Sequence, residues 1–199
     1  MIVLLVHGLG RTPCSLFGLA SEFRRDGHAT QFFAYSPTFE SLPGIVHRLT
    51  TRLRTLADRG EAVGLAGHSL GGLLLRSALV QVPQLRVKHL VMMGTPNRPP
   101  RIAAFMWRWR LFRMLTRECG RFLASPAAIL ELPPPAVPYT LIAGTAGPQR
   151  FFGEPNDAIV TVNETRIADA DEPHRVDGYH SFLMDHPATR RLVRAALTT

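Results

Sequence analysis

The sequence is poor in cysteine and lysine, and it lacks any long apolar run. Its two cysteines, Cys14 and Cys119, are too few for a disulfide framework and have no metal-ligand spacing, so we expect two reduced thiols. No apolar stretch approaches the ~20 residues that cross a bilayer. Residues 1–6 are apolar, but they have neither the charged region nor the cleavage site of a secretion signal. We therefore expect a cytoplasmic protein.

What the sequence does contain is the composition of a globular protein with a strong positive charge. Its 199 residues are 46% hydrophobic, which suits one domain over residues 1–199. The net charge is +8, and almost all of the positive charge is arginine because Lys88 is the only lysine. Such a surface either attracts nucleic acid, anionic lipid or acidic substrates, or is simply a solvated face. No nucleic-acid-binding module is recognisable, so we expect no nucleic-acid partner.

Short apolar runs alternate with longer segments of helical period. The predicted strands are 2–6, 29–35, 62–66, 87–93, 139–144 and a weak sixth at 174–177, and the predicted helices are 13–25, 41–59, 70–80 and 187–197. Uniformly apolar strands separated by helices indicate a parallel sheet that is covered on both faces. In such sheets, ligands bind beyond the carboxyl ends of the strands. Chemistry is therefore expected in the segments HGLGR, GHSLGG, GTPNR and YHSF, which follow strands.

The segment GHSLGG places Ser69 at the point where the third strand must become a helix. It fits the pattern G-x-S-x-G, in which small residues two before and two after the serine relieve crowding at a strained turn. The alternative is a glycine-rich turn in which the serine is incidental. The apolar strand before the motif and the helical pattern after it favour a nucleophile. A serine nucleophile needs a histidine to remove its proton and an acid to orient that histidine.

Two further positions complete a candidate triad. Of the eight histidines, His180 lies just past the last strand in DGYHSFLMD, at the expected active edge. Of the others, one ends the first strand, one precedes the last strand, one begins the closing helix, one lies beside the serine and the rest fall outside the strand ends. The acid should stand between the serine and the histidine in the chain. We favour Asp157, in the loop after the fifth strand, and keep Glu154 and Asp171 as alternatives.

Acyl transfer also needs N–H donors for the tetrahedral oxygen, and losing one donor removes roughly 3 to 4 kcal/mol of transition-state stabilisation. In strand–turn–helix sites of this kind, one donor is the backbone N–H after the nucleophile, here that of Leu70. The other donor follows an early strand. In HGLGR, His7 and Gly8 bend the chain back, and we expect the N–H of Leu9 to point into the site. The alternative is a glycine-rich turn without this role.

In their order and spacing, the motifs VHGLG, GHSLGG, GTPNR, NDAIVTVNET and YHSFLM resemble those of the α/β-hydrolase superfamily. They are most similar to small bacterial esterase- and lipase-like members akin to triacylglycerol lipases and PGAP1-like hydrolases. The resemblance implies a minimal fold with about six mostly parallel strands flanked by helices. It also implies Ser69 as nucleophile, His180 as general base, Asp157 as orienting acid, and Leu9 and Leu70 as oxyanion donors. It implies no cofactor, and no acidic cluster suggests the calcium site of some secreted lipases.

A long insertion, residues 97–137, separates the fourth and fifth predicted strands. Its segment RIAAFMWRWRLFRML predicts a basic amphipathic helix that holds both tryptophans. The residues predicted to share its apolar face are Ile102, Phe105, Met106, Trp109 and Phe112. Three interpretations stay open: a stripe packed on the domain, a cap that shapes an acyl pocket, or peripheral contact of residues 101–117 with an anionic membrane.

These features predict a serine hydrolase that cleaves carboxylic esters, acyl or lipid-like, through an acyl-enzyme on Ser69. The expected partner is a small-molecule ester. A thioesterase or an acyltransferase would use the same triad, so both remain alternatives. A non-catalytic, membrane-associated binding protein that retains the fold is a further alternative.

Overall fold

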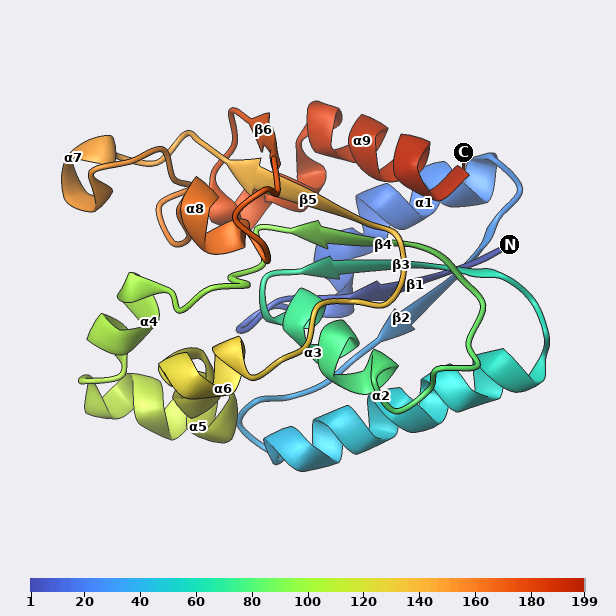
Figure 1. Ribbon diagram of the computed structural model, residues 1–199, viewed down its shortest axis with the longest axis horizontal. Coiled ribbons are helices and arrows are strands. Elements are labelled where there is room, and N and C mark those ends of the chain that lie inside the picture. Colours follow the sequence, from blue (N-terminus) through green and yellow to red (C-terminus); the bar gives the residue numbers. More distant parts are fainter. Residues whose placement is uncertain (199) are drawn as a thin grey trace.

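The computed structural model describes residues 1–198, which are built around one six-stranded sheet (Figure 1). The strands are β1 (Ile2–Val6), β2 (Ala29–Phe33), β3 (Val63–His68), β4 (Val87–Met93), β5 (Tyr139–Gly144) and β6 (His174–Val176). Their order in the sheet is β2-β1-β3-β4-β5-β6, and each neighbouring pair is parallel. The prediction of about six mostly parallel strands flanked by helices is therefore confirmed.

Helices cover both faces of the sheet. Figure 1 shows α1 (Phe17–Arg25) and α9 (Pro187–Thr198) on one face, and α2 (Leu42–Asp58) and α3 (Leu70–Leu79) on the other. Alternate side chains of β1 explain this arrangement, since Leu4 and Val6 pack with α2 and α3 while Val3 and Leu5 pack with α1 and α9. Both sides of the strand are buried, which is why its sequence is apolar throughout. None of the helices in residues 1–198 has the length and apolar character that a membrane crossing requires.

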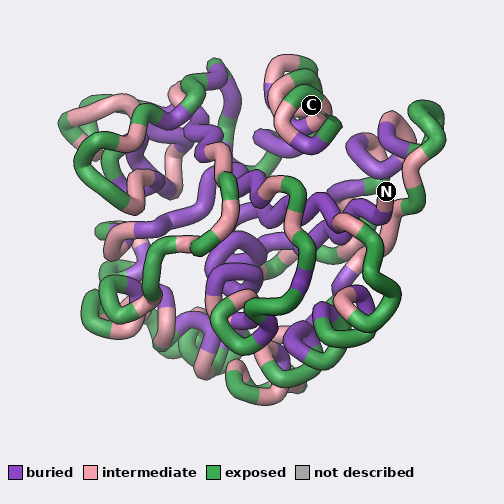
Figure 2. Tube along the Cα trace, turned by 45° about the vertical axis from the view of Figure 1, so that its right-hand side comes forward, coloured by how far each residue is buried: buried purple, intermediate pink, exposed green. Residues whose placement is uncertain are grey.

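The remaining short helices gather beyond the carboxyl ends of the strands, toward which the arrows of Figure 1 point. They are α4 (Arg101–Met106), α5 (Arg110–Leu123), α6 (Pro126–Leu130), α7 (Gln149–Phe152), α8 (Val162–Thr165) and the 3-10 helix η2 (His180–Asp185). A second 3-10 helix, η1 (Pro13–Leu16), precedes α1. Figure 2 shows that the buried residues concentrate in the strands and in α3, whose amino end lies at this edge.

The insertion departs from the sequence prediction. The single amphipathic helix expected over residues 101–117 is wrong, because the chain turns at 107–109 and separates α4 from α5. Trp109 has extended backbone angles and stands directly before α5 instead of continuing α4. The turn divides the expected apolar face, so that Met106 and Phe112 line one cavity while Phe105 and Trp109 are 53% and 61% exposed.

One buried arginine ties both ends of the insertion to α3. Arg76 donates a hydrogen bond to the Asn97 side chain at 2.9 Å, and two more to the carbonyl groups of Leu132 and Pro133 at 2.7 and 2.9 Å. Burial lowers the pKa of its guanidinium to about 10. Asn97 in turn donates to the carbonyl of Thr165 at 2.8 Å. The segment that leaves β4 and the segment that returns toward β5 are therefore held by the same side chain.

Candidate active site

Ser69 occupies the sharp turn between β3 and α3. Its φ of 52° and ψ of −124° are unusual for a residue with a side chain, and such a conformation costs about 1–3 kcal/mol. Glycines make the turn possible, because a Cβ at Gly67 would lie 2.5 Å from the backbone nitrogen of Gly72, and one at Gly71 would meet the carbonyl of Val6. The Ser69 N–H donates to the carbonyl of Met93 at 2.8 Å. The turn is thus fixed to the neighbouring strand.

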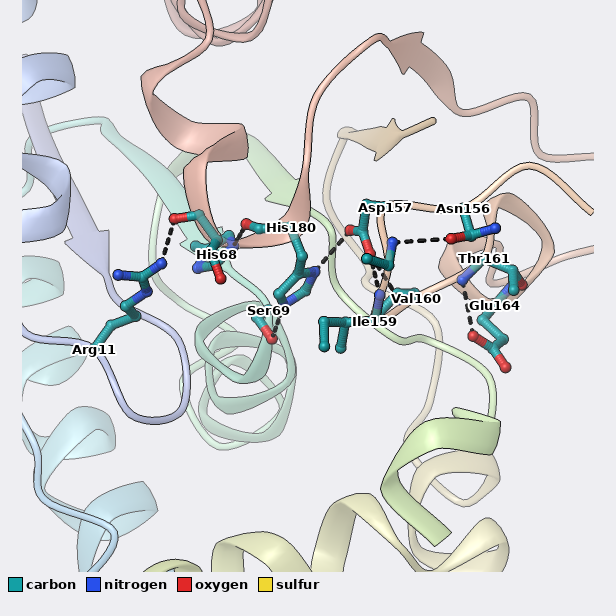
Figure 3. Close-up of polar contacts among 12 residues, drawn as sticks. Arg11, His68, Ser69, Asn156, Asp157, Ile159, Val160, Thr161, Glu164 and His180 are labelled. Carbon is teal, nitrogen blue, oxygen red and sulfur yellow. Dashed lines mark hydrogen bonds and ion pairs between the residues drawn. The ribbon is translucent and has the colours of Figure 1, made fainter. Parts of the chain in front are cut away.

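Three side chains from distant parts of the chain form a continuous hydrogen-bonded row (Figure 3). His180 Nε2 lies 3.0 Å from Ser69 Oγ, and His180 Nδ1 lies 2.7 Å from Asp157 Oδ2. With the ring proton on Nδ1, His180 donates to the carboxylate and its Nε2 accepts from the serine hydroxyl. All three residues are buried, at 7% exposure for Ser69, 9% for His180 and 1% for Asp157. This is the geometry that activates a serine toward a carbonyl carbon.

The loop around Asp157 aligns its carboxylate. Oδ1 accepts from the N–H groups of Ile159 and Val160 at 3.0 and 2.7 Å, which leaves Oδ2 for the histidine. The Asp157 carbonyl accepts from the His180 N–H at 2.8 Å, so the acid loop and the histidine also meet through their backbones. The carboxylate therefore has one orientation fixed by the protein before any substrate arrives.

The two alternative acids are engaged elsewhere. Glu154 forms an ion pair with Arg101. Asp171 accepts from two N–H groups of its own loop, both at 2.8 Å, and from the Tyr139 hydroxyl at 2.9 Å. Of the three carboxylates considered from the sequence, Asp157 is the one that the fold brings to His180.

The two expected oxyanion donors, Leu9 and Leu70, belong to segments that meet at Ser69. Gly8 to Arg11 form a β-turn closed by a 3.2 Å bond from the Arg11 N–H to the Gly8 carbonyl, with Gly10 at a φ of 66°. Leu9 sits within this turn and lines the same cavity as Ser69. Leu70 is the first residue of α3, whose positive end faces the site. Within residues 1–198 neither the Leu9 nor the Leu70 N–H has a hydrogen-bond acceptor, so both remain available to an oxyanion.

His68 supports the site in a way that sequence reasoning did not find. Its Nε2–H donates to the carbonyl of His180 at 3.0 Å, so it holds the backbone of the candidate base. Burial, and then the nearby charge of His180, hold the pKa of His68 well below its ordinary value. The ring is therefore neutral near pH 7 and adds no charge beside the triad. Its place next to the serine gave no sequence signal for this contact, which depends on the fold.

Glu164 is a second missed contributor, and here a signal existed. Thr161 to Glu164 match the T-x-x-E capping pattern, and the reciprocal bonds are present at 3.2 and 2.9 Å. The second carboxylate oxygen of this buried residue accepts from the Arg101 N–H at 2.9 Å. Glu164 therefore connects the end of the acid loop to the start of α4.

A cavity of about 260 Å³ opens directly at Ser69 and His180. Its walls are mainly apolar side chains from the segment after β4, the insertion and the acid loop: Pro96, Pro100, Ile102, Ala103, Met106, Phe112, Leu123, Ile159 and Val160. The cavity is small for a ligand site and fits an acyl group of modest length. Among the side chains that the structure describes, no three His, Cys, Asp or Glu groups converge as a metal site would need.

Comparison with known proteins shows similarity in structure and none in sequence. No protein-family model matches the chain, and no curated protein matches its sequence. The mature lipase BlEst2 of Bacillus licheniformis superposes with a TM-score of 0.78 at 19% identity, over 99% of this chain and 91% of the lipase.

Two further solved structures superpose over nearly the whole chain. MGS-MChE2, an α/β-hydrolase enzyme from the sediment metagenome of the Mar Chica lagoon in Morocco, gives a TM-score of 0.65 at 18% identity, with 98% and 89% coverage of this chain and of that one. The RedJ thioesterase of Streptomyces coelicolor gives 0.61 at 20% identity, with 99% and 84% coverage.

Proposed function

Because the chain has the α/β-hydrolase fold, we propose that it is a serine hydrolase that cleaves carboxylic esters, acyl or lipid-like, through an acyl-enzyme on Ser69. The observation that carries this proposal is the row Ser69–His180–Asp157, with contacts of 3.0 and 2.7 Å at the base of an apolar cavity. A buried serine in a strained turn, paired with an oriented histidine, has no evident structural purpose.

The first half of the reaction forms the acyl-enzyme. Ser69 Oγ bonds to the ester carbonyl carbon as its proton passes to His180 Nε2, and the carbonyl oxygen becomes an oxyanion. The N–H groups of Leu9 and Leu70 stabilise that oxyanion. The bond to the leaving alcohol then breaks, the alcohol oxygen takes the proton from His180, and the acyl group stays on Ser69. Asp157 remains ionised and stabilises the imidazolium in between.

The second half returns the enzyme to its starting state. Water gives a proton to His180 Nε2 and its oxygen bonds to the acyl carbon, which again produces an oxyanion. The bond to Ser69 Oγ breaks, the serine recovers its proton from His180, and the carboxylic acid leaves. The apolar lining of the cavity supports an acyl group as the part of the substrate that it holds.

We propose that residues 1–199 act as one domain in which residues 97–137 form a cap over the acyl group. Met106, Phe112 and Leu123 of this segment line the cavity, which supports this role. A thioester substrate or an alcohol acceptor would use the same groups, so a thioesterase and an acyltransferase are the alternatives. Competition between water and added alcohols during product analysis separates transfer from hydrolysis.

The decisive experiment compares the wild type with Ser69→Ala on 4-nitrophenyl acetate, butyrate and octanoate, together with labelling by a fluorophosphonate probe. We expect hydrolysis and labelling of the wild type and neither with the variant. Equal hydrolysis by the two proteins, or failure of the probe to label the wild type, would reject a serine hydrolase and favour the non-catalytic binding protein.

The outer surface of α4 and α5 supports a second proposal, that residues 101–117 make peripheral contact with an anionic membrane. Large apolar side chains are exposed here among exposed arginines, a combination suited to a lipid interface. The exposed apolar residues are Phe105, Trp109, Leu111, Met114 and Leu115.

Co-sedimentation with vesicles tests this contact. We expect binding to phosphatidylglycerol vesicles that weakens in high salt, weak binding to phosphatidylcholine vesicles, and loss of binding in Leu111→Ser/Met114→Ser. The exposed Val80 lies at the end of α3, so Val80→Ser is the matched control and should bind normally. Equal binding by the double variant and the wild type would exclude this surface.

A further inference from the structure

The cavity at Ser69 contains one permanently charged side chain. Among the described residues that line it, Arg11 is the only arginine, lysine, aspartate or glutamate. Arg11 is the last residue of the β-turn that carries Leu9, so its position is set by the same turn that positions the candidate oxyanion donor. In Figure 3, Arg11 and Asp157 lie on opposite sides of the Ser69–His180 pair. A positive charge therefore stands beside the reacting groups, away from the acid.

The guanidinium of Arg11 is held, but it is not neutralised. One nitrogen donates to the carbonyl of Ser181, the residue after His180, and the guanidinium carbon lies 5.7 Å from the centre of the Phe182 ring. Within residues 1–198 Arg11 forms no ion pair with a carboxylate, whereas Arg98, Arg101 and other arginines do.

These contacts leave the guanidinium free for an anion. A guanidinium has five N–H donors, and the contact with Ser181 uses only one of them. The carbonyl and the ring orient the group, so little side-chain entropy remains to be lost when an anion binds. The positive charge of Arg11 is also one of the smaller contributions that lower the pKa of His68, after burial and the charge of His180.

The chemistry of the cavity wall decides which part of a substrate Arg11 meets. The side chains contributed by α4 and α5 are apolar apart from Thr116, and they suit an acyl chain. An anionic group placed among these side chains would lose its hydrating water and gain no cation or hydrogen-bond donor in return, which is unfavourable. An anionic group on the leaving alcohol can instead pair with Arg11 at the rim, by the forked hydrogen bonds that guanidinium forms with carboxylate or phosphate.

We propose that Arg11 makes this site selective for esters of modest acyl length whose leaving group carries a carboxylate or a phosphate. This inference rests on the proposed hydrolase function and assigns the substrate class of that same site. Arg11 acts here as a specificity residue that contacts substrate and takes no part in proton transfer.

Paired chromogenic esters provide the test. 4-Nitrophenyl octanoate and 3-octanoyloxy-4-nitrobenzoate share the acyl group, and 2-nitrophenyl octanoate is added as the neutral ester with the same ortho-nitrophenol leaving group, so that this last pair differs in the carboxylate alone. We expect the wild type to show the higher kcat/KM on the anionic ester, mainly through a lower KM. Arg11→Gln, which keeps a donor for the Ser181 carbonyl, should reduce the ratio of anionic to neutral kcat/KM by about tenfold, the effect of ~1.4 kcal/mol. Arg11→Lys should recover part of that ratio.

A second pair and a control complete the design. 1-Octanoylglycerol 3-phosphate against 1-octanoylglycerol asks whether an ester with a phosphate on its leaving group is preferred to the neutral ester. Arg54→Gln on the exposed side of α2 should change neither ratio. A wild type without preference for either anionic ester would overturn the inference. So would an Arg11→Gln variant that slows both members of each pair equally, because that result means a structural role. Absence of hydrolysis of every ester by the wild type would reject the proposed function itself, and the inference with it.

Discussion

Replacing Asp157 by asparagine separates the orienting role of this residue from its structural role. Asp157 Oδ1 accepts from two backbone N–H groups of its loop, and Oδ2 accepts from His180. In Asp157→Asn only an oxygen can accept those two N–H groups, so the amide oxygen must take the Oδ1 position. The amide nitrogen then faces His180 Nδ1 and donates to it. His180 is forced to carry its proton on Nε2, where it can no longer accept the proton of Ser69.

The size of the effect follows from this tautomer change. Replacing the acid by its amide in a triad with the same connectivity lowers kcat by about 10⁴, which is ~5.5 kcal/mol in the activation free energy. The loop itself should survive because both N–H groups keep their acceptor. Asp157→Ala removes that acceptor as well, and two buried N–H groups without partners destabilise the protein by about 1–3 kcal/mol each.

Single-turnover and steady-state hydrolysis of 4-nitrophenyl octanoate measures the catalytic loss, and urea unfolding measures stability. We expect Asp157→Asn to lose about 10⁴ in kcat with nearly normal stability, and Asp157→Ala to lose both activity and stability. Glu154→Gln is the matched control and should keep its activity. An Asp157→Asn variant with more than a tenth of the wild-type kcat would refute the argument that this carboxylate orients the base.

Three further predictions concern the turn, the buried ring and the cavity. Ser69→Gly should unfold with about 1 kcal/mol more free energy than Ser69→Ala, because glycine tolerates the positive φ; equal values in urea unfolding would argue against strain there. The pKa of His68 is lowered on folding, so below pH ~6.5 the unfolded chain binds a proton that the folded protein does not. The free energy of unfolding therefore decreases as the pH is lowered, by up to ~1.4 kcal/mol per pH unit. This pH dependence should be smaller in His68→Gln. Unchanged slopes between pH 7 and 5 would contradict that linkage. Ala103→Trp should fill the cavity and cut kcat/KM for octanoate at least tenfold relative to acetate, and a uniform loss on both esters would point to misfolding.

The parallel sheet was predictable because its signal is local and repeated. Each strand is a short apolar run, since both of its faces are buried, and the helices carry their apolar residues at a period of three and four. The strand ends could also be ordered along one edge, which led to Ser69 and His180. The subgroup akin to triacylglycerol lipases and PGAP1-like hydrolases, and the cytoplasmic location, stay predictions.

What the sequence could not supply depends on contacts between distant segments. Loop geometry decides among Asp157, Glu154 and Asp171. Glu154 forms an ion pair with Arg101, and Asp171 accepts from the Tyr139 hydroxyl and from backbone N–H groups, so neither faces His180. The insertion was misread for a related reason. A helical period over residues 101–117 does not reveal that the chain turns at 107–109 and that Met106 and Phe112, on either side of the turn, line the same cavity.

Because Arg76 anchors both ends of the insertion, we expect the segment between the two anchoring points to be exchangeable as a unit. Both ends of residues 97–137 are hydrogen-bonded to α3, the helix that begins directly after Ser69. We therefore expect substitutions between these two anchoring points to leave the hydrogen bonds of Ser69, His180 and Asp157 unchanged. A chimera that keeps Arg76 and Asn97 and exchanges only the segment between the two anchoring points should keep the reaction of this protein. It should acquire the substrate preference of the protein that supplies the segment.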